Sequence, residues 1–183
     1  MHRYQLFETA HGVAAIAWSR AGVMGFRLPA SSADSTGRAL ARRFPQAIRA
    51  DPPPDIADTI AAARHYFTGR KTDFSGVRVD LGAQDPFFAQ VYAVVRRLGW
   101  GQTTTYGAVA KELGAGPEAA RDVGQAMAAN PVPLIIPCHR VLAAGGKIGG
   151  FSAPGGAESK LRMLTIEGLD LSPSPPAQQG FAF

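Results

Sequence analysis

The sequence predicts an α+β protein in which a small α/β domain precedes a mostly helical one. Three apolar stretches, separated by glycine or polar residues, begin the chain and are typical of a short antiparallel meander: residues 4–9, 12–19 and 22–28. From residue 85 onward the apolar residues follow helical spacing, and a glycine-containing turn separates two short helices. The last residues are rich in Pro, Ser and Gln. We therefore expect domains at residues 1–84 and 85–170 and a flexible tail at 171–183.

Two helices complete the predicted N-terminal domain. Ser32 is placed to cap a helix over 31–44. A proline-rich connector at 51–54 leads to a second helix over 56–67, which has an apolar face. One further strand is predicted over 77–81. No group of residues in this half points to a chemical reaction.

The composition is that of a globular protein, with 46% hydrophobic and 18% charged residues. Neither a run of eighteen apolar residues nor a signal-peptide pattern is present, so we expect a cytoplasmic protein, associated with the nucleoid if it is bacterial. The single cysteine excludes an internal disulfide, and the four histidines show no metal-ligand spacing. The net charge of +5 suits a polyanionic partner but does not prove one.

The second half contains a candidate helix-turn-helix. Asp85 is placed as the N-cap of a helix that runs to Gly99. Thr105 caps a short helix over 106–113, and after a glycine-containing break another helix covers 117–129. Two short helices joined in this way match a helix-turn-helix, and a helical hairpin used only for packing is the alternative.

The helix over 117–129 is notable for its small residues: Ala119, Ala120, Gly124, Ala126, Ala128 and Ala129. Small side chains let a backbone approach another surface closely, and that surface is either another helix or a narrow DNA minor groove. Arg121 is one of the few long side chains here. It is either a solvated arginine or a side chain that reaches between bases.

Cys138 is the candidate nucleophile. Three prolines punctuate the apolar run over 131–137, which predicts a short, buried, rigid extended segment that delivers the cysteine. A lone cysteine is most often an inert buried residue, but His139 and Arg140 flank this one, and their charges favour a thiolate. Adjacent residues on an extended segment point to opposite faces. We therefore expect His139 to act on the sulfur through a water, with a carboxylate elsewhere that orients the imidazole.

Five ordered blocks between residues 85 and 168 resemble the O6-alkylguanine-DNA alkyltransferases, also called methylated-DNA–protein-cysteine S-methyltransferases. The blocks are GQTTTYG (101–107), AARDVG (119–124), NP (130–131), IPCHRV (136–141) and EG (167–168). The first 84 residues agree with the variable N-terminal domain of that family only in size and pattern. The resemblance implies a ribonuclease-H-like N-terminal sheet with helices, followed by a winged-helix-like domain that contains the helix-turn-helix.

The resemblance also implies direct-reversal DNA repair. A single-turnover enzyme of this kind flips the damaged base of double-stranded DNA through the minor groove. It then moves the alkyl group of O6-alkylguanine, with O4-alkylthymine as a second candidate substrate, irreversibly to its own Cys138. The reaction needs no cofactor and no metal, and we expect a monomer that does not associate with membranes.

Individual residues match the family motifs. Cys138 matches the alkyl acceptor, and His139 matches the base that acts through a water. Glu167 matches the carboxylate that orients this base, and Asn130 the asparagine that braces the active-site turn.

The resemblance assigns further residues to DNA and to the substrate. Tyr106 matches the tyrosine that pushes on the 3′ phosphate of the target, and Arg121 matches the finger that fills the gap left by the flipped base. The expected DNA contacts are Thr105, Tyr106, Ala119, Ala120, Arg121 and Gly124, and the expected pocket residues are Val141, Phe151 and Ser152. Phe151 stands where many relatives have a tyrosine that protonates the leaving guanine, so this donor is expected to be missing.

Three other classes of function were weighed against this one. An alkyltransferase-like lesion sensor shares the architecture without the cysteine, so Cys138 argues against it, whereas Phe151 keeps it open. A winged-helix transcription regulator would read the major groove with long polar side chains, which the small-residue helix lacks. A cysteine hydrolase would need an oxyanion hole and a direct Cys–His pair, which adjacency in the sequence disfavours.

Overall fold

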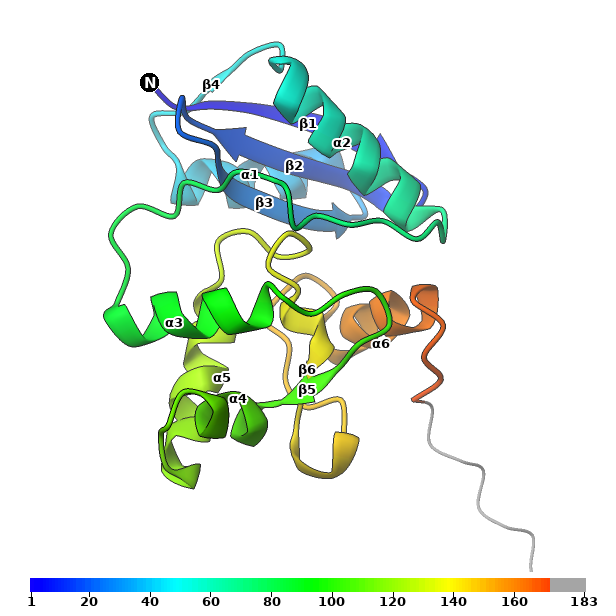
Figure 1. Cartoon of the computed structure of the whole chain (residues 1–183). Coiled ribbons are helices and arrows are strands. Elements are labelled where there is room, and N and C mark those ends of the chain that lie inside the picture. The colour runs from blue at the N-terminus through cyan, green and yellow to red at the C-terminus, as the bar shows by residue number, and fades with distance from the viewer. Residues whose placement is uncertain (172–183) are drawn as a thin grey trace, which may run out of the picture.

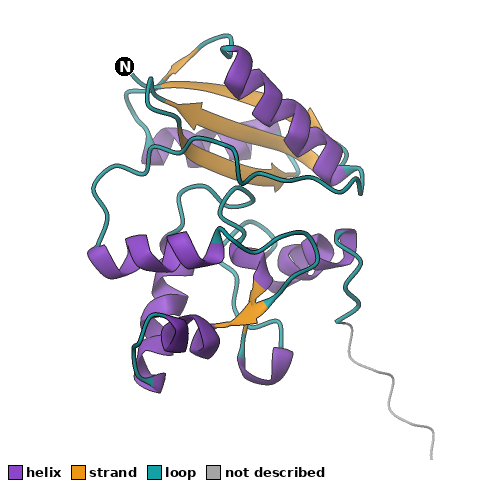
Figure 2. Ribbon diagram, viewed as in Figure 1, coloured by secondary structure: helices purple, strands orange, loops and turns teal. Residues whose placement is uncertain are grey.

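The computed structural model of the chain describes residues 1–171. The longer strands lie in the N-terminal half, whereas helices dominate the C-terminal half (Figure 2). Apart from residue 171, the predicted flexible tail lies outside the described residues. Among the helices of the described part, none combines the length and the hydropathy that a membrane span requires.

Four strands form the N-terminal sheet in the order β3-β2-β1-β4. The first three pair in antiparallel fashion, as the apolar stretches separated by glycine or polar residues predicted, and β4 runs parallel to β1. Their bounds are β1 (Arg3–Thr9), β2 (Gly12–Trp18), β3 (Val23–Ala30) and β4 (Ile48–Arg49). The two residues of β4 are too few to produce a recognisable pattern, so the sequence did not predict this strand.

Helices α1 (Ala33–Arg43) and α2 (Pro54–Phe67) cover opposite faces of this sheet (Figure 1). The side chain of Ser32 accepts a hydrogen bond from the backbone N–H of Ser35, which confirms the predicted N-cap of α1. The prediction of α2 is also confirmed, and the helix begins two residues earlier than expected, at a proline that suits the first turn.

The central strand β2 is buried on both faces, because its residues alternate between the two helices. Ala15 and Ala17 pack with Leu40 of α1. Ile16 belongs to the larger core, which includes Ile60 of α2. Both helices are therefore held by apolar contacts with the same strand.

The predicted strand over 77–81 is wrong. Only Val79 pairs with the sheet, in an isolated bridge with Val23. The segment meets β3 at its first residue alone, next to Gly22. A Cβ atom on Gly22 would lie 2.6 Å from the carbonyl oxygen of Arg78, so only glycine permits this close crossing.

Up to residue 171, the C-terminal half consists of four α-helices, three short 3-10 helices and one pair of short parallel strands. The bounds of the α-helices and strands are α3 (Pro86–Val95), β5 (Thr104–Thr105), α4 (Tyr106–Glu112), α5 (Ala120–Ala129), β6 (Val141–Leu142) and α6 (Gly156–Ile166). The predicted helix over 85–99 stops earlier because its last residues close tighter i to i+3 bonds instead. The predicted helix over 117–129 starts as a 3-10 turn, Pro117–Ala119, before α5.

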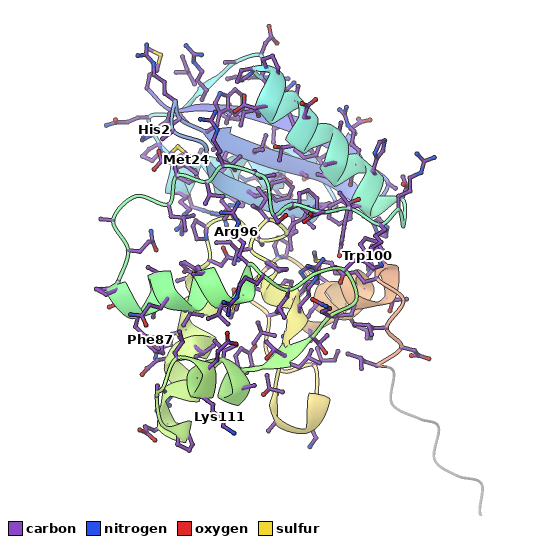
Figure 3. All side chains as sticks on the ribbon, in the orientation of Figure 1. His2, Met24, Phe87, Arg96, Trp100 and Lys111 are labelled. Atoms are coloured by element: carbon purple, nitrogen blue, oxygen red, sulfur yellow. The ribbon has the colours of Figure 1, made fainter. Side chains whose placement is uncertain are left out.

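The two halves of the chain meet in one hydrophobic core. A single cluster of buried side chains draws on both of them. The backbone N–H of Phe26 donates to the carbonyl of Pro131 across the junction at 2.9 Å. Trp100 lies where the halves meet (Figure 3), and its ring packs edge-to-face against Tyr66 with centroids 5.5 Å apart. Side chains near the end of α2 are thereby placed against the C-terminal half.

Candidate active site

Cys138 begins a 3-10 turn, Cys138–Arg140, directly after a compact proline-rich turn. The preceding run over 131–137 is buried, but it is not extended as predicted. The N–H of Ile136 donates to the carbonyl of Val132 at 2.9 Å, and Leu134 has a positive φ of 77°. The expectation of an extended segment is therefore wrong, because the chain folds back on itself here.

Asn130 holds this turn together. Its side-chain amide donates to the carbonyl of Ile136 at 2.8 Å, and its amide oxygen accepts from the N–H of Val132 at 3.0 Å. These two bonds bridge the base of the turn and fix the position from which Cys138 projects. Leu134 has a left-handed backbone, which is unfavourable for a bulky residue. The two hydrogen bonds of Asn130 stabilise this conformation.

His139 and Glu167 form a buried pair behind the cysteine. The Nε2 atom of His139 lies 2.6 Å from Oε1 of Glu167, and neither side chain is exposed to solvent. The other ring nitrogen, Nδ1, is buried and has no hydrogen-bond partner within the described residues. Glu167 therefore occupies Nε2 of the imidazole, whereas Nδ1 is available to exchange a proton with another group.

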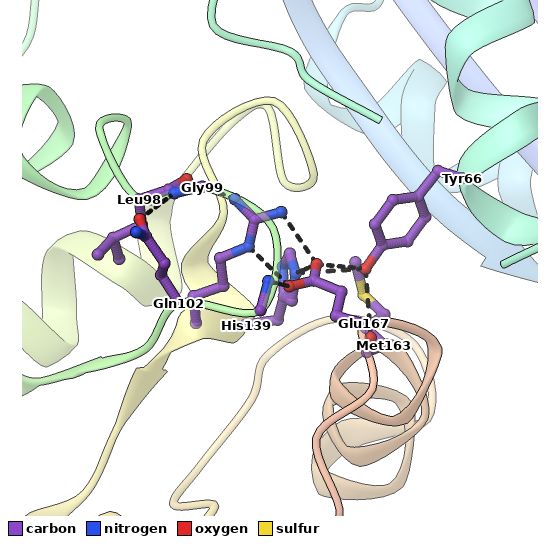
Figure 4. A network of polar contacts seen from close by, with 9 residues as sticks. Tyr66, Leu98, Gly99, Gln102, His139, Met163 and Glu167 are labelled. Carbon is purple, nitrogen blue, oxygen red and sulfur yellow. Dashed lines mark hydrogen bonds and ion pairs between the residues drawn. The ribbon is translucent and has the colours of Figure 1, made fainter. Parts of the chain in front are cut away.

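Glu167 sits at the C-terminal end of α6 and accepts several hydrogen bonds (Figure 4). Its Oε2 accepts from Nε of Arg140 at 2.9 Å and from the N–H of Gly101 at 3.0 Å. Its Oε1 accepts from the Tyr66 hydroxyl at 2.8 Å and from Arg140 Nη2 at 3.0 Å. Burial by itself would raise the pKa of Glu167, but the hydrogen bonds and charges of His139 and Arg140 outweigh burial and lower this pKa to about 2.

The thiol of Cys138 is 5% exposed, and burial raises its pKa above the usual range. The expectation that the flanking charges of His139 and Arg140 favour a thiolate is therefore wrong. Burial also lowers the pKa of His139, and the guanidinium of Arg140 is bonded to Glu167 instead of the sulfur. The resting sulfur is accordingly a thiol that needs a base.

Lys160 supplies the positive charge near the sulfur, and the sequence analysis missed it. This residue of α6 is fully buried, and its ammonium donates to the carbonyl of Val141 at 2.6 Å and to the Tyr106 hydroxyl at 3.4 Å. Burial lowers the pKa of Lys160 to about 8, although Cys138 acts in the opposite direction. The helical spacing could have indicated that Lys160 is buried, since position 160 shares a face with the buried Met163 and Leu164.

A cavity of about 470 Å³ opens above the cysteine. Its lining is Tyr106, Gly124, Met127, Ala128, Cys138, Gly150, Phe151 and Ser152. The cavity is mostly apolar with a few polar groups, which is typical of a small-molecule or base pocket. It unites the predicted nucleophile with two of the three predicted pocket residues. Val141 is fully buried and does not line it, because its carbonyl holds Lys160 instead.

The remaining predicted residues lie at the end of β5, on α4, on α5 and in the 3-10 turn before α5. Thr105 caps α4, its hydroxyl accepting from the N–H of Ala108 at 3.1 Å. Along α5, Val123, Ala126 and Met127 are buried, whereas Arg121 is exposed. Ala119, Ala120 and Gly124 are half-buried at the edge of this exposed face. Ala126 is thus part of the core, whereas the other small residues form a partly exposed helix face that continues to the cavity at Gly124 and Ala128.

The chain is similar to proteins of one known family. The family model described as "6-O-methylguanine DNA methyltransferase, DNA binding domain" matches residues 86–169. A methylated-DNA–protein-cysteine methyltransferase of Metallosphaera sedula is 41% identical over 57% of this chain and 62% of its own length. A relative of the same name from Mycolicibacterium paratuberculosis is 36% identical over 63% of this chain and 67% of its own length. The alignment with the first of these relatives spans less than two thirds of that protein.

Solved structures extend the similarity over nearly the whole chain. The O6-methylguanine methyltransferase of Mycobacterium tuberculosis is 30% identical, with a TM-score of 0.71 over 91% of this chain and 93% of its own. A structure of the Mycobacterium tuberculosis protein OGT in complex with DNA is 28% identical, with a TM-score of 0.72 over 90% of this chain and 92% of its own. The chain therefore belongs to the methylated-DNA–protein-cysteine methyltransferase family.

Proposed function

We propose that this protein repairs O6-alkylguanine in double-stranded DNA by moving the alkyl group to its own Cys138. The observation that carries the proposal is the position of the only cysteine of the chain, at the floor of a cavity that borders the small-residue face of α5. The names of the relatives and the DNA-bound neighbour support it. We propose that the protein acts as a monomer, since the nucleophile, the base and the cavity can be assembled from the described residues of a single copy.

We further infer the finer architecture from this function. The N-terminal domain (1–84) is a ribonuclease-H-like sheet with helices, and the domain over 85–170 is winged-helix-like, with α4 and α5 as its helix-turn-helix. The contacts between α4 and α5 and the parallel pair β5–β6 support the second assignment. In this arrangement α5 is the recognition helix and lies in the minor groove.

The first chemical step is the removal of a proton from Cys138. The thiol proton passes to Nδ1 of His139 through a water, and Nε2–H of His139 donates to Glu167. The unpartnered Nδ1 supports this direction of transfer, since it is the free acceptor on the ring. The step is required because the raised pKa of the cysteine leaves the sulfur protonated.

The second step is an in-line displacement at the alkyl carbon. The sulfur forms a bond with this carbon while the bond from carbon to O6 of guanine breaks, and the guanine leaves with the electron pair. The leaving base must gain a proton, and the Tyr106 hydroxyl in the cavity is the donor, which Lys160 replenishes at 3.4 Å. Tyr106 thus replaces the donor that Phe151 lacks. A thioether is chemically stable, so each molecule acts once.

Binding to DNA prepares this chemistry. The target base must leave the duplex to reach the cavity, at a cost of a few kcal/mol that is smaller for a poorly paired lesion. Arg121 projects from α5 as an exposed side chain and fills the gap in the stack. Tyr106, at the start of α4 and on the cavity wall, contacts the 3′ phosphate as the base passes.

The proposal is tested with a duplex that contains O6-methylguanine labelled in its methyl group. We expect one label per protein molecule, retained after denaturation, and none on Cys138→Ser. Binding of the lesion without any transfer would instead identify a lesion sensor. A release of label into solution, with repeated turnover, would identify a hydrolytic enzyme.

A further inference from the structure

We propose that Tyr66, which comes from α2 in the N-terminal half, is a positioning residue for the proton relay of Cys138. Its hydroxyl orients the carboxylate of Glu167 and thereby holds His139 with Nδ1 free to receive the thiol proton. The inference rests on the proposed function, and it gives the N-terminal half a direct part in the reaction.

The hydroxyl of Tyr66 reaches the centre of the relay. It donates to Oε1 of Glu167 at 2.8 Å and lies 3.3 Å from Nε2 of His139 and 3.3 Å from the carbonyl oxygen of Met163. Tyr66 extends from α2 toward Glu167 and His139, which belong to the opposite half of the molecule (Figure 4). Three elements that are distant in sequence therefore converge on one hydroxyl group.

The ring of Tyr66 is held rigidly. It is fully buried, and Phe67 and Trp100 pack edge-to-face against it at centroid distances of 5.1 and 5.5 Å. Phe74, from the segment that follows α2, adds a tilted contact at 6.2 Å. Burying a hydroxyl costs free energy unless it forms hydrogen bonds, so a phenylalanine would suffice here if packing alone were needed.

The protonation state of Tyr66 determines which group donates in its hydrogen bond with Glu167. Burial, and then the charge of Glu167, raise the pKa of Tyr66 further, so the phenol stays protonated and donates. Oε1 of Glu167 then accepts from Tyr66 and from Nε2–H of His139. With the ring proton fixed on Nε2, the lone pair of His139 is left on Nδ1.

A donor on Glu167 also sets how strongly the carboxylate holds a proton on His139. The charged and titratable groups that face this imidazole are Glu167, Arg140, Lys160, Cys138 and the phenol of Tyr66. Loss of the Tyr66 hydroxyl makes Glu167 a stronger acceptor, which raises the pKa of His139. The imidazole is then protonated, and unable to act as a base, at a higher pH than in the parent protein.

Tyr66→Phe tests the proposal, with Tyr92→Phe as the matched control. Tyr92 is also a buried tyrosine, but its hydroxyl donates to the backbone carbonyl of Ala126 at 2.9 Å, a bond that involves neither His139 nor Glu167. The single-turnover rate with free O6-benzylguanine is measured against pH. Affinity for duplex DNA is measured in the Cys138→Ser background.

We expect Tyr66→Phe to lower the rate about tenfold, as the loss of an orienting hydrogen bond does at other sites. The acidic limb of its pH profile should move to higher pH, while affinity for DNA stays unchanged. Tyr92→Phe should leave the limb in place. A folded Tyr66→Phe protein with the parent rate and the parent pH profile would overturn the inference.

Two further measurements keep the test decisive. If Tyr66→Phe does not fold, a difluorotyrosine at position 66 retains the ring and strengthens the donor, and the acidic limb should then move to lower pH; an unmoved limb contradicts the inference. If the parent protein transfers no alkyl group, the proposed function fails by itself. In that case ¹⁵N spectra of His139 still test the inference. They should show a single Nε2–H tautomer in the parent protein and a changed tautomer population in Tyr66→Phe.

Discussion

At the scale of single residues, the reactivity of the sulfur depends on its neighbours and not on an intrinsically low pKa. Cys138 is buried and its pKa is raised, so it resembles an inert core cysteine in isolation. The unpartnered Nδ1 of His139 and the charge of Lys160 distinguish it from such a residue. A buried thiol of this kind is protected from adventitious oxidants and reacts only when a base and an electrophile are both in place.

The first prediction concerns pH. His139 must be neutral to accept the thiol proton, and burial lowers its pKa below the ordinary 6.5. The rate of transfer should therefore remain constant as pH falls through 6.5 and decline only below that value. Stopped-flow measurements with O6-benzylguanine check this. Half-loss of the rate above pH 6.5 would mean that the imidazole is not the buried base described here.

The second prediction concerns the donor to the leaving guanine. Tyr106→Phe should lower the transfer rate about a hundredfold, the range typical of a lost general acid. Phe151→Tyr, which places a hydroxyl on the wall of the same cavity, should restore part of the rate in that background. Phe151→Tyr alone serves as the control and should react like the parent. An unaltered rate in Tyr106→Phe would remove this residue from the chemical step.

At the scale of elements, α5 combines two functions on two faces. Its apolar residues anchor it in the core, and its small exposed residues continue to the cavity, whose wall includes Gly124 and Ala128. A bulky exposed face would prevent close approach to a groove, so the alanine-rich composition suits the contact with DNA that we propose for α5. Arg121 is the side chain that extends beyond this surface.

The third prediction separates DNA contact from chemistry. Arg121→Ala should slow the repair of O6-methylguanine in duplex DNA by about tenfold or more, since the finger that we propose would help to keep the base outside the stack. Its reaction with the free base O6-benzylguanine should be unchanged, because no stack is involved. Arg38→Ala, which alters an exposed arginine of α1, is the control for loss of charge. Equal losses with both substrates would contradict the role of a finger.

At the scale of the whole molecule, Glu167 joins the two halves. Tyr66, Gly101, His139 and Arg140 all direct hydrogen bonds to its carboxylate. The same hydrogen bonds of Glu167 therefore hold the candidate active site together and connect the two halves. A substitution that weakens the interface should therefore also disturb the site, and the reverse should hold.

The fourth prediction concerns acid stability. The folded pKa of Glu167 is about 2, below the ordinary 4.5, so its contribution to stability is present above pH 4.5 and is lost as pH falls toward 2. Glu167→Gln should destabilise the protein by about 3 kcal/mol at pH 7, because Arg140 loses its buried partner. Urea unfolding measures this, with the exposed Glu158→Gln as the control. Equal stability of the two variants would contradict a structural role for the carboxylate.

Much of this architecture was accessible from the sequence, because strand alternation, caps and helical spacing are local signals. Ser32, Asp85 and Thr105 each cap the helix that they were predicted to cap. The local pattern did not predict the turn before Cys138, although the family resemblance indicated that Asn130 braces it. The side chain of Asn130 overrides the extended preference of a proline-rich run. Tyr66 was missed because its importance arises from contacts between distant segments, which no local pattern reports. The helix period places Lys160 on a buried face, but its contact with Val141 comes from a distant segment.

The most direct test of the account is peptide mass spectrometry after exposure to a duplex that contains O6-methylguanine, beside an undamaged duplex of the same sequence. The account predicts that the peptide containing Cys138 gains the mass of one methyl group, in proportion to the damaged DNA consumed and only with the damaged duplex. An unmodified Cys138 peptide, while the lesion disappears from the DNA, would contradict it.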